Sequence, residues 1–212
     1  MTTEKTASVK PAKTSIAATR RIAFCGVFGA IAAVLMLFEI PLPFAPAFYK
    51  LDLSELPVLI GSFCFGPVAG AVIELVKILL KMLIKGSSTA GVGELANFIV
   101  GCSLVVPAGF LYSKMKTRNG AILGMAAGTV IMTILGCFIN AFVLLPFYAN
   151  AFEMPIDALI GMGTAVNASI TDLFSFVMLA VAPFNLLKGI VVSVLTFLLY
   201  KRISRLVKSA ED

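Results

Sequence analysis

The longest uncharged stretch of this chain, residues 119–152, restricts the possible folds more than any other feature of the sequence. A helix of 34 residues would be about 50 Å long, well beyond a bilayer hydrocarbon core of about 30 Å. The rest of the chain is also apolar, since 59% of its 212 residues are hydrophobic, 13% are charged and mean hydropathy is +1.02. One soluble core could not bury so much apolar surface, and the apolar runs are continuous rather than alternating as in membrane β-strands. The sequence therefore predicts an all-α integral membrane protein.

Prolines, glycines and charges divide the apolar sequence into six expected membrane helices. Because the long uncharged stretch is too long for one crossing, we expect the fifth helix to end near Pro146. An external loop that includes Glu153, Pro155 and Asp157 would follow. The other expected helices cover residues 22–38, 56–65, 67–85, 94–113 and 166–202, the last of them interrupted by Pro183, Asn185 and Lys188. Residues 1–18 are expected to form a polar basic tail, residues 19–205 the membrane domain, and residues 206–212 a short C-terminal tail.

The distribution of basic residues predicts the orientation of these helices. The N-terminal segment, the turn at 114–118 and the C-terminus carry five, three and four lysines and arginines, twelve of the 17 in the chain. Cytoplasmic segments of membrane proteins are enriched in these residues, so an even number of helices places both termini in the cytoplasm. The net charge of +6 is then a signal of topology and not of nucleic-acid binding.

Several residue types that many functions need are missing or isolated. The sequence has no histidine, which is the commonest general base and metal ligand, and its four cysteines stand singly in apolar segments. These features argue against an intramembrane metalloenzyme and against a carrier of metal ions. The sequence also contains no GxxxxGK[ST] pattern, so we do not expect an ATPase. Tryptophan is absent too, which leaves phenylalanine and tyrosine for aromatic stacking.

Residues 38–57, FEIPLPFAPAFYKLDLSELP, form the first polar interruption after a long apolar run. Three prolines prevent a helix there, because each lacks an N–H and restricts the residue before it. The segment is nevertheless rich in apolar side chains, among them Phe44, Tyr49 and Leu51. A stiff apolar loop with charges at its margins is typical of a lid that folds back over a cavity. The alternative is a tight connector between two membrane helices.

Two sets of polar residues fall at membrane depth, where charges usually face a bundle interior or water. The first set shares one helix face and comprises Glu74, Lys77, Lys81 and Lys85. Within it, we expect Glu74 to form a structural ion pair with Lys77 or Lys81.

The second set is a candidate binding site in the outer half of the membrane. Asn185 and Lys188 lie one turn apart, and Asn140 on the fifth helix is expected at a similar depth. Asparagines offer donors and acceptors together, which suits a ligand with alternating N–H and C=O groups, and lysine adds three donors. Aromatic walls could come from Phe44, Tyr49, Phe142, Phe147, Tyr148 and Phe184. Alternatively, the asparagines merely hydrogen-bond between helices and Lys188 pairs with an acid.

Small residues recur at four-residue spacing on the first helix. Gly26 is followed by Ala30, and Gly29 by Ala33. Such spacing allows a second helix to approach closely. The second helix could belong to this chain or to a partner.

Several motifs together resemble a known family. The segments EIPLPFAPAFYKLDLSELPVLIGSFCFGPVAG, GELANFIVGCSLVVPAG, NAFVLLPFY and PFNLLKG are similar, in this order, to the riboflavin-binding (RibU-type) S components of energy-coupling-factor (ECF) vitamin transporters. The similarity covers residues 20–201 and leaves the N-terminal tail outside.

The resemblance implies six helices, a flavin site near the outer face gated by the first loop, and no catalytic residues or cofactor. The residues it implies for riboflavin binding are Asn140, Asn185 and Lys188, and the walls and lid of the site would be Phe44, Tyr49, Leu51, Tyr148 and Phe184. It also implies partners: a membrane coupling protein, EcfT, and two cytoplasmic ATPases, EcfA and EcfA′, in the plasma membrane of a prokaryote. The docking surface would be the set Gly26, Gly29, Ala30 and Ala33, in which glycines replace some of the family's usual alanines.

Two other functions stay open at this point. The chain could be an S component for another vitamin such as folate or thiamine, although the absence of tryptophan weakens the thiamine version and two motifs favour flavin. It could also be a membrane enzyme or a structural subunit, but the buried candidates Glu74, Glu94, Asp172 and Lys188 form no evident catalytic group.

Overall fold

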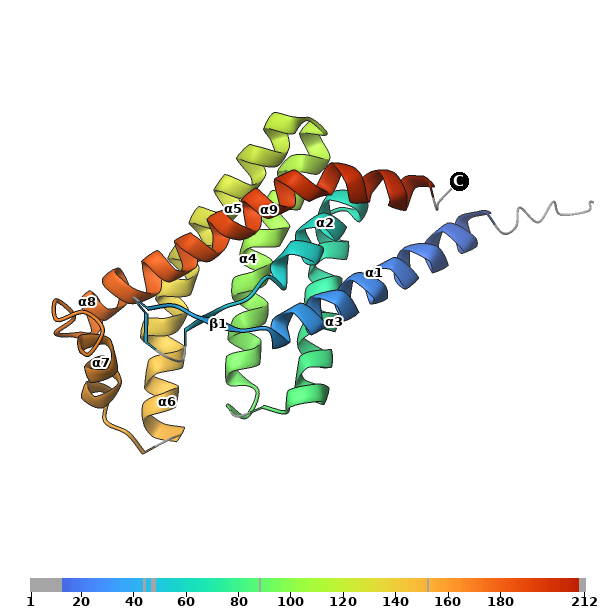
Figure 1. The fold of residues 1–212 in the computed structure, drawn as a ribbon. Coiled ribbons are helices and arrows are strands. Elements are labelled where there is room, and N and C mark those ends of the chain that lie inside the picture. The colour runs from blue at the N-terminus through green and yellow to red at the C-terminus, as the bar shows by residue number, and fades with distance from the viewer. Residues whose placement is uncertain (1–12, 44, 47–48, 88, 152, 210–212) are drawn as a thin grey trace, which may run out of the picture.

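The computed structural model describes residues 13–209 except positions 44, 47–48, 88 and 152, and at 13–17 and 203–209 it describes the backbone alone. The described part is helical apart from one small hairpin (Figure 1). Its elements are α1 (Lys13–Leu37), β1 (Ile40–Pro41), β2 (Lys50–Leu51), α2 (Glu55–Phe65), α3 (Pro67–Lys85), α4 (Val92–Met115), α5 (Arg118–Ile139), the π-helix η1 (Asn140–Leu144), α6 (Leu145–Ala151), α7 (Ile156–Thr164), α8 (Leu173–Phe176), the π-helix η2 (Val177–Val181) and α9 (Ala182–Ser209).

Four helical segments are long and apolar enough to cross a membrane: Ala18–Leu37, Val92–Met115, Arg118–Ala151 and Leu173–Arg202. The other two expected membrane helices correspond to α2 and α3. Helix α2 has 11 residues, and α3 carries a row of charged side chains. By length and composition alone, both helices are therefore poor candidates for membrane spans, although α2 is buried over most of its length.

Helix α4 stands between α3 and α5, and α5 in turn packs against α9. Helix α1 packs along α3, and Figure 1 shows it running diagonally toward the hairpin at the middle of the molecule. The hairpin strands pair antiparallel, with Ile40 opposite Leu51. One core lies among α1, α2, α3, α4, α5 and α9, and a second lies where α6 and α7 pack on α8 and η2. The segment between α1 and α2 thus runs across the bundle, between the two cores.

A predicted helix end and a predicted interruption, both at a proline, are not found. The fifth helix continues past Pro146 to Ala151, and Pro183 lies inside a continuous helix. A five-residue π-helix precedes each proline by one residue, with Leu145 N–H donating to Asn140 O and Ala182 N–H donating to Val177 O. The wider turn moves the helix to the i→i−5 pattern where a proline would disrupt the i→i−4 pattern, so the chain passes the proline without a break.

The ends of two other helices also differ from expectation. The last membrane helix begins at Leu173 rather than near 166, because Asp172 caps it by accepting a hydrogen bond from Ser175 N–H at 2.7 Å. A separate short helix, α7, occupies part of the predicted external loop. At the other end of the chain, α1 already begins at Lys13, inside the stretch expected to be a tail.

Candidate functional site

Residues of the segment between α1 and α2 line a cavity. The cavity has a volume of about 680 Å³. Tyr49 of this segment reaches η1, where its hydroxyl donates to Asn140 Oδ1 at 2.5 Å. Its ring lies 5.2 Å from the ring of Phe184. The segment is therefore packed onto the helices that carry the predicted site, and we call residues 39–54 the lid.

Six of the predicted site residues line this one cavity: Tyr49, Asn140, Tyr148, Phe184, Asn185 and Lys188. Leu51 is buried in β2, between lid residues that line the cavity, and Phe44 lies outside the described residues. The aromatic wall expected from Phe142 is not there, because this side chain is 72% exposed and stacks on Phe138 instead. The sequence-based site is thus brought together by the lid, η1 and α9.

The two asparagines are held by their own helices. Asn140 Nδ2 donates to Gly136 O at 2.8 Å, and Asn185 Nδ2 donates to Val181 O at 3.0 Å. Gly136 lies directly against Asn185, since a Cβ at Gly136 would be 2.9 Å from Asn185 Nδ2. The two amides are therefore fixed side chains of a close α5–α9 contact, and each keeps a second amide N–H beyond the one used here.

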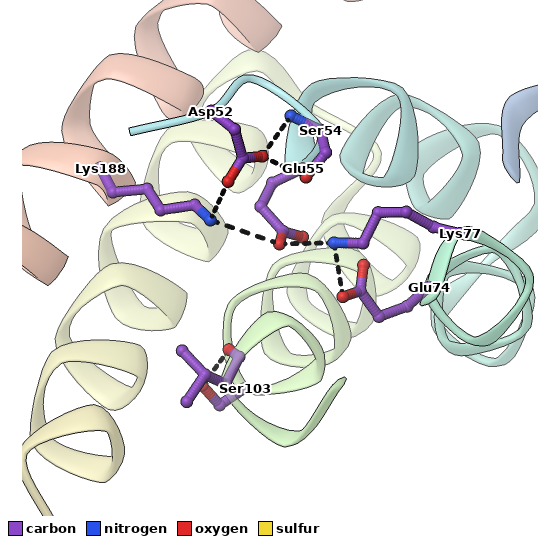
Figure 2. A network of polar contacts seen from close by, with 8 residues as sticks. Asp52, Ser54, Glu55, Glu74, Lys77, Ser103 and Lys188 are labelled. Carbon is purple, nitrogen blue, oxygen red and sulfur yellow. Dashed lines mark hydrogen bonds and ion pairs between the residues drawn. The ribbon is translucent and has the colours of Figure 1, made fainter. Parts of the chain in front are cut away.

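Lys188 belongs to a buried network of charges (Figure 2). Its Nζ lies 3.0 Å from Asp52 Oδ2 of the lid and 3.9 Å from Glu55 Oε1 at the start of α2. Lys77 then joins Glu55, at 2.8 Å, to Glu74, at 2.6 Å. The expected Glu74–Lys77 pair is thus confirmed. The network connects the lid with α2, α3 and α9.

The partners of Lys188 were the part of the site that sequence reasoning missed. The sequence raised the possibility of an acidic partner but did not identify it, and Asp52 and Glu55 were noticed only as charges at the margin of the lid. An available signal was that a lysine at this depth needs a carboxylate, and the lid supplies several. Asp52 and Lys188 are 136 positions apart, so no local spacing connects them.

The end of the cavity beside the loop between α3 and α4 carries a second ion pair. Glu94 accepts hydrogen bonds from Lys81 at 2.9 Å and from the hydroxyls of Ser87 and Thr89 at 2.8 and 2.9 Å. The charged side chains that line the whole cavity are Glu39, Asp52, Glu55 and Glu94 on one hand and Lys50, Lys81, Lys85 and Lys188 on the other. Four carboxylates and four ammonium groups balance, so the cavity suits a ligand without net charge.

The contact between the lid and Lys188 is expected to be insensitive to pH between 5 and 8. Burial alone would raise the pKa of Asp52, but the charges of Lys188 and Lys77 and the hydrogen bonds from Ser54 outweigh it and hold this pKa at about 2. A lowered pKa means that the stabilisation is complete above the ordinary pKa of 3.8 and disappears as the pH falls through about 2. The rate of tryptic cleavage after Lys50 should therefore be constant across this range after correction for trypsin activity on an unstructured peptide. A corrected cleavage rate that rises tenfold toward pH 5 would contradict the lowered pKa of Asp52.

The small residues on α1 divide into two groups. Gly29 and Ala33 are buried, and a Cβ at Gly29 would lie 2.5 Å from Val76 Cγ1 of α3. This pair is buried inside the chain, with Gly29 facing α3. Gly26 and Ala30 are exposed, and nothing described lies within 4 Å of a Cβ at Gly26. In the described part of the chain, this second pair lies on the outer face of α1.

Known proteins are similar to this chain along nearly its whole length. The family model described as "ECF transporter, substrate-specific component" matches residues 20–200. A riboflavin transporter RibU from Staphylococcus aureus (strain TCH60) is 35% identical over 196 residues, which cover 92% of this chain and 96% of the relative. A riboflavin transporter FmnP from Bacillus subtilis (strain 168) is 34% identical over 182 residues, which cover 85% and 90%. A solved structure described as the S component of a bacterial ECF transporter is 35% identical, with a TM-score of 0.70 over 90% of this chain and 98% of that one.

Proposed function

The chain belongs to the substrate-specific components of ECF transporters, and on this premise we propose that it binds riboflavin in the cavity beneath the lid for uptake into the cell. It is a transport subunit and not an enzyme. One observation supports the ligand above all: Asn140, Asn185 and Lys188 line the same cavity as Tyr49 and Phe184. The relatives that are named riboflavin transporters support the same ligand.

The chemistry of riboflavin suits these residues. The pyrimidine edge of its isoalloxazine ring alternates C=O and N–H groups, which asparagine amides and an ammonium group can match. The flat apolar ring fits between aromatic side chains such as Tyr49, Tyr148 and Phe184. The ribityl hydroxyls would lie toward the polar outer end, near Thr89 and Asn97. Riboflavin is also uncharged, as the balanced lining of the cavity favours.

We further propose six membrane segments with both termini in the cytoplasm. Helices α2 and α3 would supply the two segments beyond the four apolar spans, with the charges of α3 turned inward. The lid and the loop after α3 would then face outward, and the basic turn after α4 and the C-terminal end of α9 would face the cytoplasm of a prokaryotic cell. Figure 1 is consistent with this arrangement, since α7 and α8 lie at the end of the last membrane helix opposite the C-terminus.

Uptake requires a source of energy that this chain does not contain. We propose that the membrane protein EcfT and the ATPases EcfA and EcfA′ supply it, and that the exposed pair Gly26 and Ala30 lies at the contact with EcfT. Close approach of helices at small residues favours this contact. The family to which the chain belongs supports these partners.

The ligand is tested by quenching of riboflavin fluorescence with the detergent-purified protein. We expect tight, saturable quenching by the wild type and about tenfold to 100-fold weaker binding by Asn185→Ala, because one or more hydrogen bonds in a dry cavity are lost. A matched control is Asn167→Ala, which alters an asparagine of the external segment between α7 and α8 outside the cavity lining.

Three outcomes can be distinguished. Equal quenching by all three proteins would keep riboflavin as the ligand and reject the site. No quenching by folded wild-type protein would reject riboflavin and leave an S component for another vitamin, to be identified by the same titration with folate and thiamine. Quenching that only Asn185→Ala loses would support ligand and site together.

A further inference from the structure

Asp52 lies in the lid and contacts the lysine of the proposed site. We propose that Asp52 is a positioning residue for the ligand: its carboxylate fixes the Lys188 ammonium group at the cavity wall, and this contact couples closure of the lid to ligand affinity. The proposal rests on the proposed function, because it assigns a role toward the same ligand.

The carboxylate of Asp52 is itself fixed before it meets Lys188. Its Oδ1 accepts hydrogen bonds from Ser54 N–H at 2.9 Å and from the Ser54 hydroxyl. Its Oδ2 is directed at Lys188 Nζ, 3.0 Å away, as Figure 2 shows. The two oxygens therefore have separate tasks: one holds the backbone turn before α2, and the other holds the ammonium group. Asp52 is 6% exposed, so the contact lies at the cavity wall and largely out of bulk solvent.

Lys188 remains able to bind a ligand while it is held. Among the described residues, Asp52 Oδ2 is the one acceptor within hydrogen-bonding distance of Nζ, since Glu55 Oε1 lies 3.9 Å away. Glu55 Oε1 already accepts from Lys77 at 2.8 Å. An ammonium group has three N–H donors, so two of them are left for acceptors in the cavity. A carbonyl oxygen beside Asn185 would be such an acceptor.

The arrangement of charges predicts what happens when Asp52 is neutralised. Lys188 would then have one remaining carboxylate nearby, Glu55, and its flexible chain would let the ammonium group move toward that residue. Glu55 belongs to the inner part of the network with Lys77 and Glu74. The ammonium group would leave the wall that carries the asparagines. The lid would lose its charged contact with α9 at the same time.

A double-mutant cycle tests this coupling. Riboflavin affinity is measured by fluorescence quenching for the wild type, Asp52→Asn, Lys188→Met and the double variant. We expect about tenfold weaker binding for Asp52→Asn and an equal or larger loss for Lys188→Met. The double variant should bind no more weakly than Lys188→Met alone, because Asp52 acts only through Lys188. Losses that multiply, or an Asp52→Asn variant with wild-type affinity, would overturn the proposal.

Two further variants keep the test decisive if Asp52→Asn does not fold. Ser54→Ala removes the hydroxyl donor to Asp52 without changing any charge, and its smaller loss of affinity should likewise vanish in the Lys188→Met background. Asp157→Asn is the matched control, an exposed acidic residue in the first turn of α7 outside the cavity lining. It should leave affinity unchanged.

A readout without ligand separates this proposal from the proposed function. Lys50 is exposed in the lid, two residues before Asp52, so trypsin can report on lid opening. Asp52→Asn and Lys188→Met should each speed cleavage after Lys50, and the double variant should cleave no faster than either. If wild-type protein fails to bind riboflavin but this pattern holds, the ligand is wrong and the contact between lid and lysine stands. If riboflavin binds and cleavage is the same in all four proteins, the contact is overturned alone.

Discussion

Replacing Gly128 with alanine is expected to lower the free energy of unfolding by about 2 kcal/mol. Gly128 lies in α5 where it crosses α4, and a Cβ there would be 2.3 Å from the carbonyl oxygen of Leu104. That oxygen belongs to a helix backbone, so it cannot move aside as a flexible side chain could. The two helices would have to separate, which costs packing along the whole contact. Thermal or denaturant unfolding of the purified protein measures the loss.

A matched substitution isolates the steric effect. Gly161 lies in the short helix α7, and nothing described is within 4 Å of a Cβ built there. Gly161→Ala should be neutral or stabilising by up to about 1 kcal/mol, because alanine favours a helix more than glycine does. If both alanine variants unfold like the wild type, the α4–α5 contact is looser than described. Gly128→Ala also tests the site, because α5 leads directly into η1, which carries Asn140.

The sequence predicted the helices well where composition alone determines them. Long apolar runs separated by charges, such as the basic turn after α4, divide the chain at nearly the positions that the structure shows. The differences came at Pro146, where a helix end was expected, and at Pro183, where an interruption of the last helix was expected. A proline is normally a strong sign of a helix end, but here the local widening to a π-helix removes the conflict. Nothing in the single sequence distinguishes a proline that ends a helix from one that a π-helix precedes.

The candidate site was predictable to the extent that it depends on periodicity. Asn185 and Lys188 are one turn apart, and Glu74 and Lys77 are an i, i+3 pair, so spacing alone places each couple on one face. The contacts of Asp52 with Lys188 and of Glu55 with Lys77 depend on how the lid and α2 fold onto α3 and α9. Such contacts follow from tertiary packing, and a sequence pattern carries no information about them. The division of the small residues on α1 into a buried and an exposed pair has the same cause.

Replacing Lys77 with methionine is expected to lower the free energy of unfolding by about 3–5 kcal/mol. Lys77 is fully buried and lies between two buried carboxylates, Glu55 at 2.8 Å and Glu74 at 2.6 Å. Methionine fills a similar volume but removes the cation that holds Glu74, and it leaves Glu55 with Lys188, 3.9 Å away. An unpaired buried charge costs far more than the ion pair contributes, which is why the loss should be large. Unfolding of the detergent-purified protein at neutral pH measures it.

Lys81→Met provides the matched control on the same helix. Lys81 pairs with Glu94, but Glu94 also accepts hydrogen bonds from Ser87 and Thr89, so it stays partnered when the lysine is lost. The Lys81 side chain is 18% exposed, so Lys81→Met should lower the free energy of unfolding by about 1 kcal/mol or less. Adding Glu74→Gln to Lys77→Met should restore part of the stability, because it removes the carboxylate that lost its cation. If the Lys77 and Lys81 variants unfold alike, or if Glu74→Gln makes the Lys77 variant worse, the buried network does not hold its charges in the pairs described. Lys188 would then have no fixed set of carboxylates beneath it, and the coupling of the lid to the ligand would need another basis.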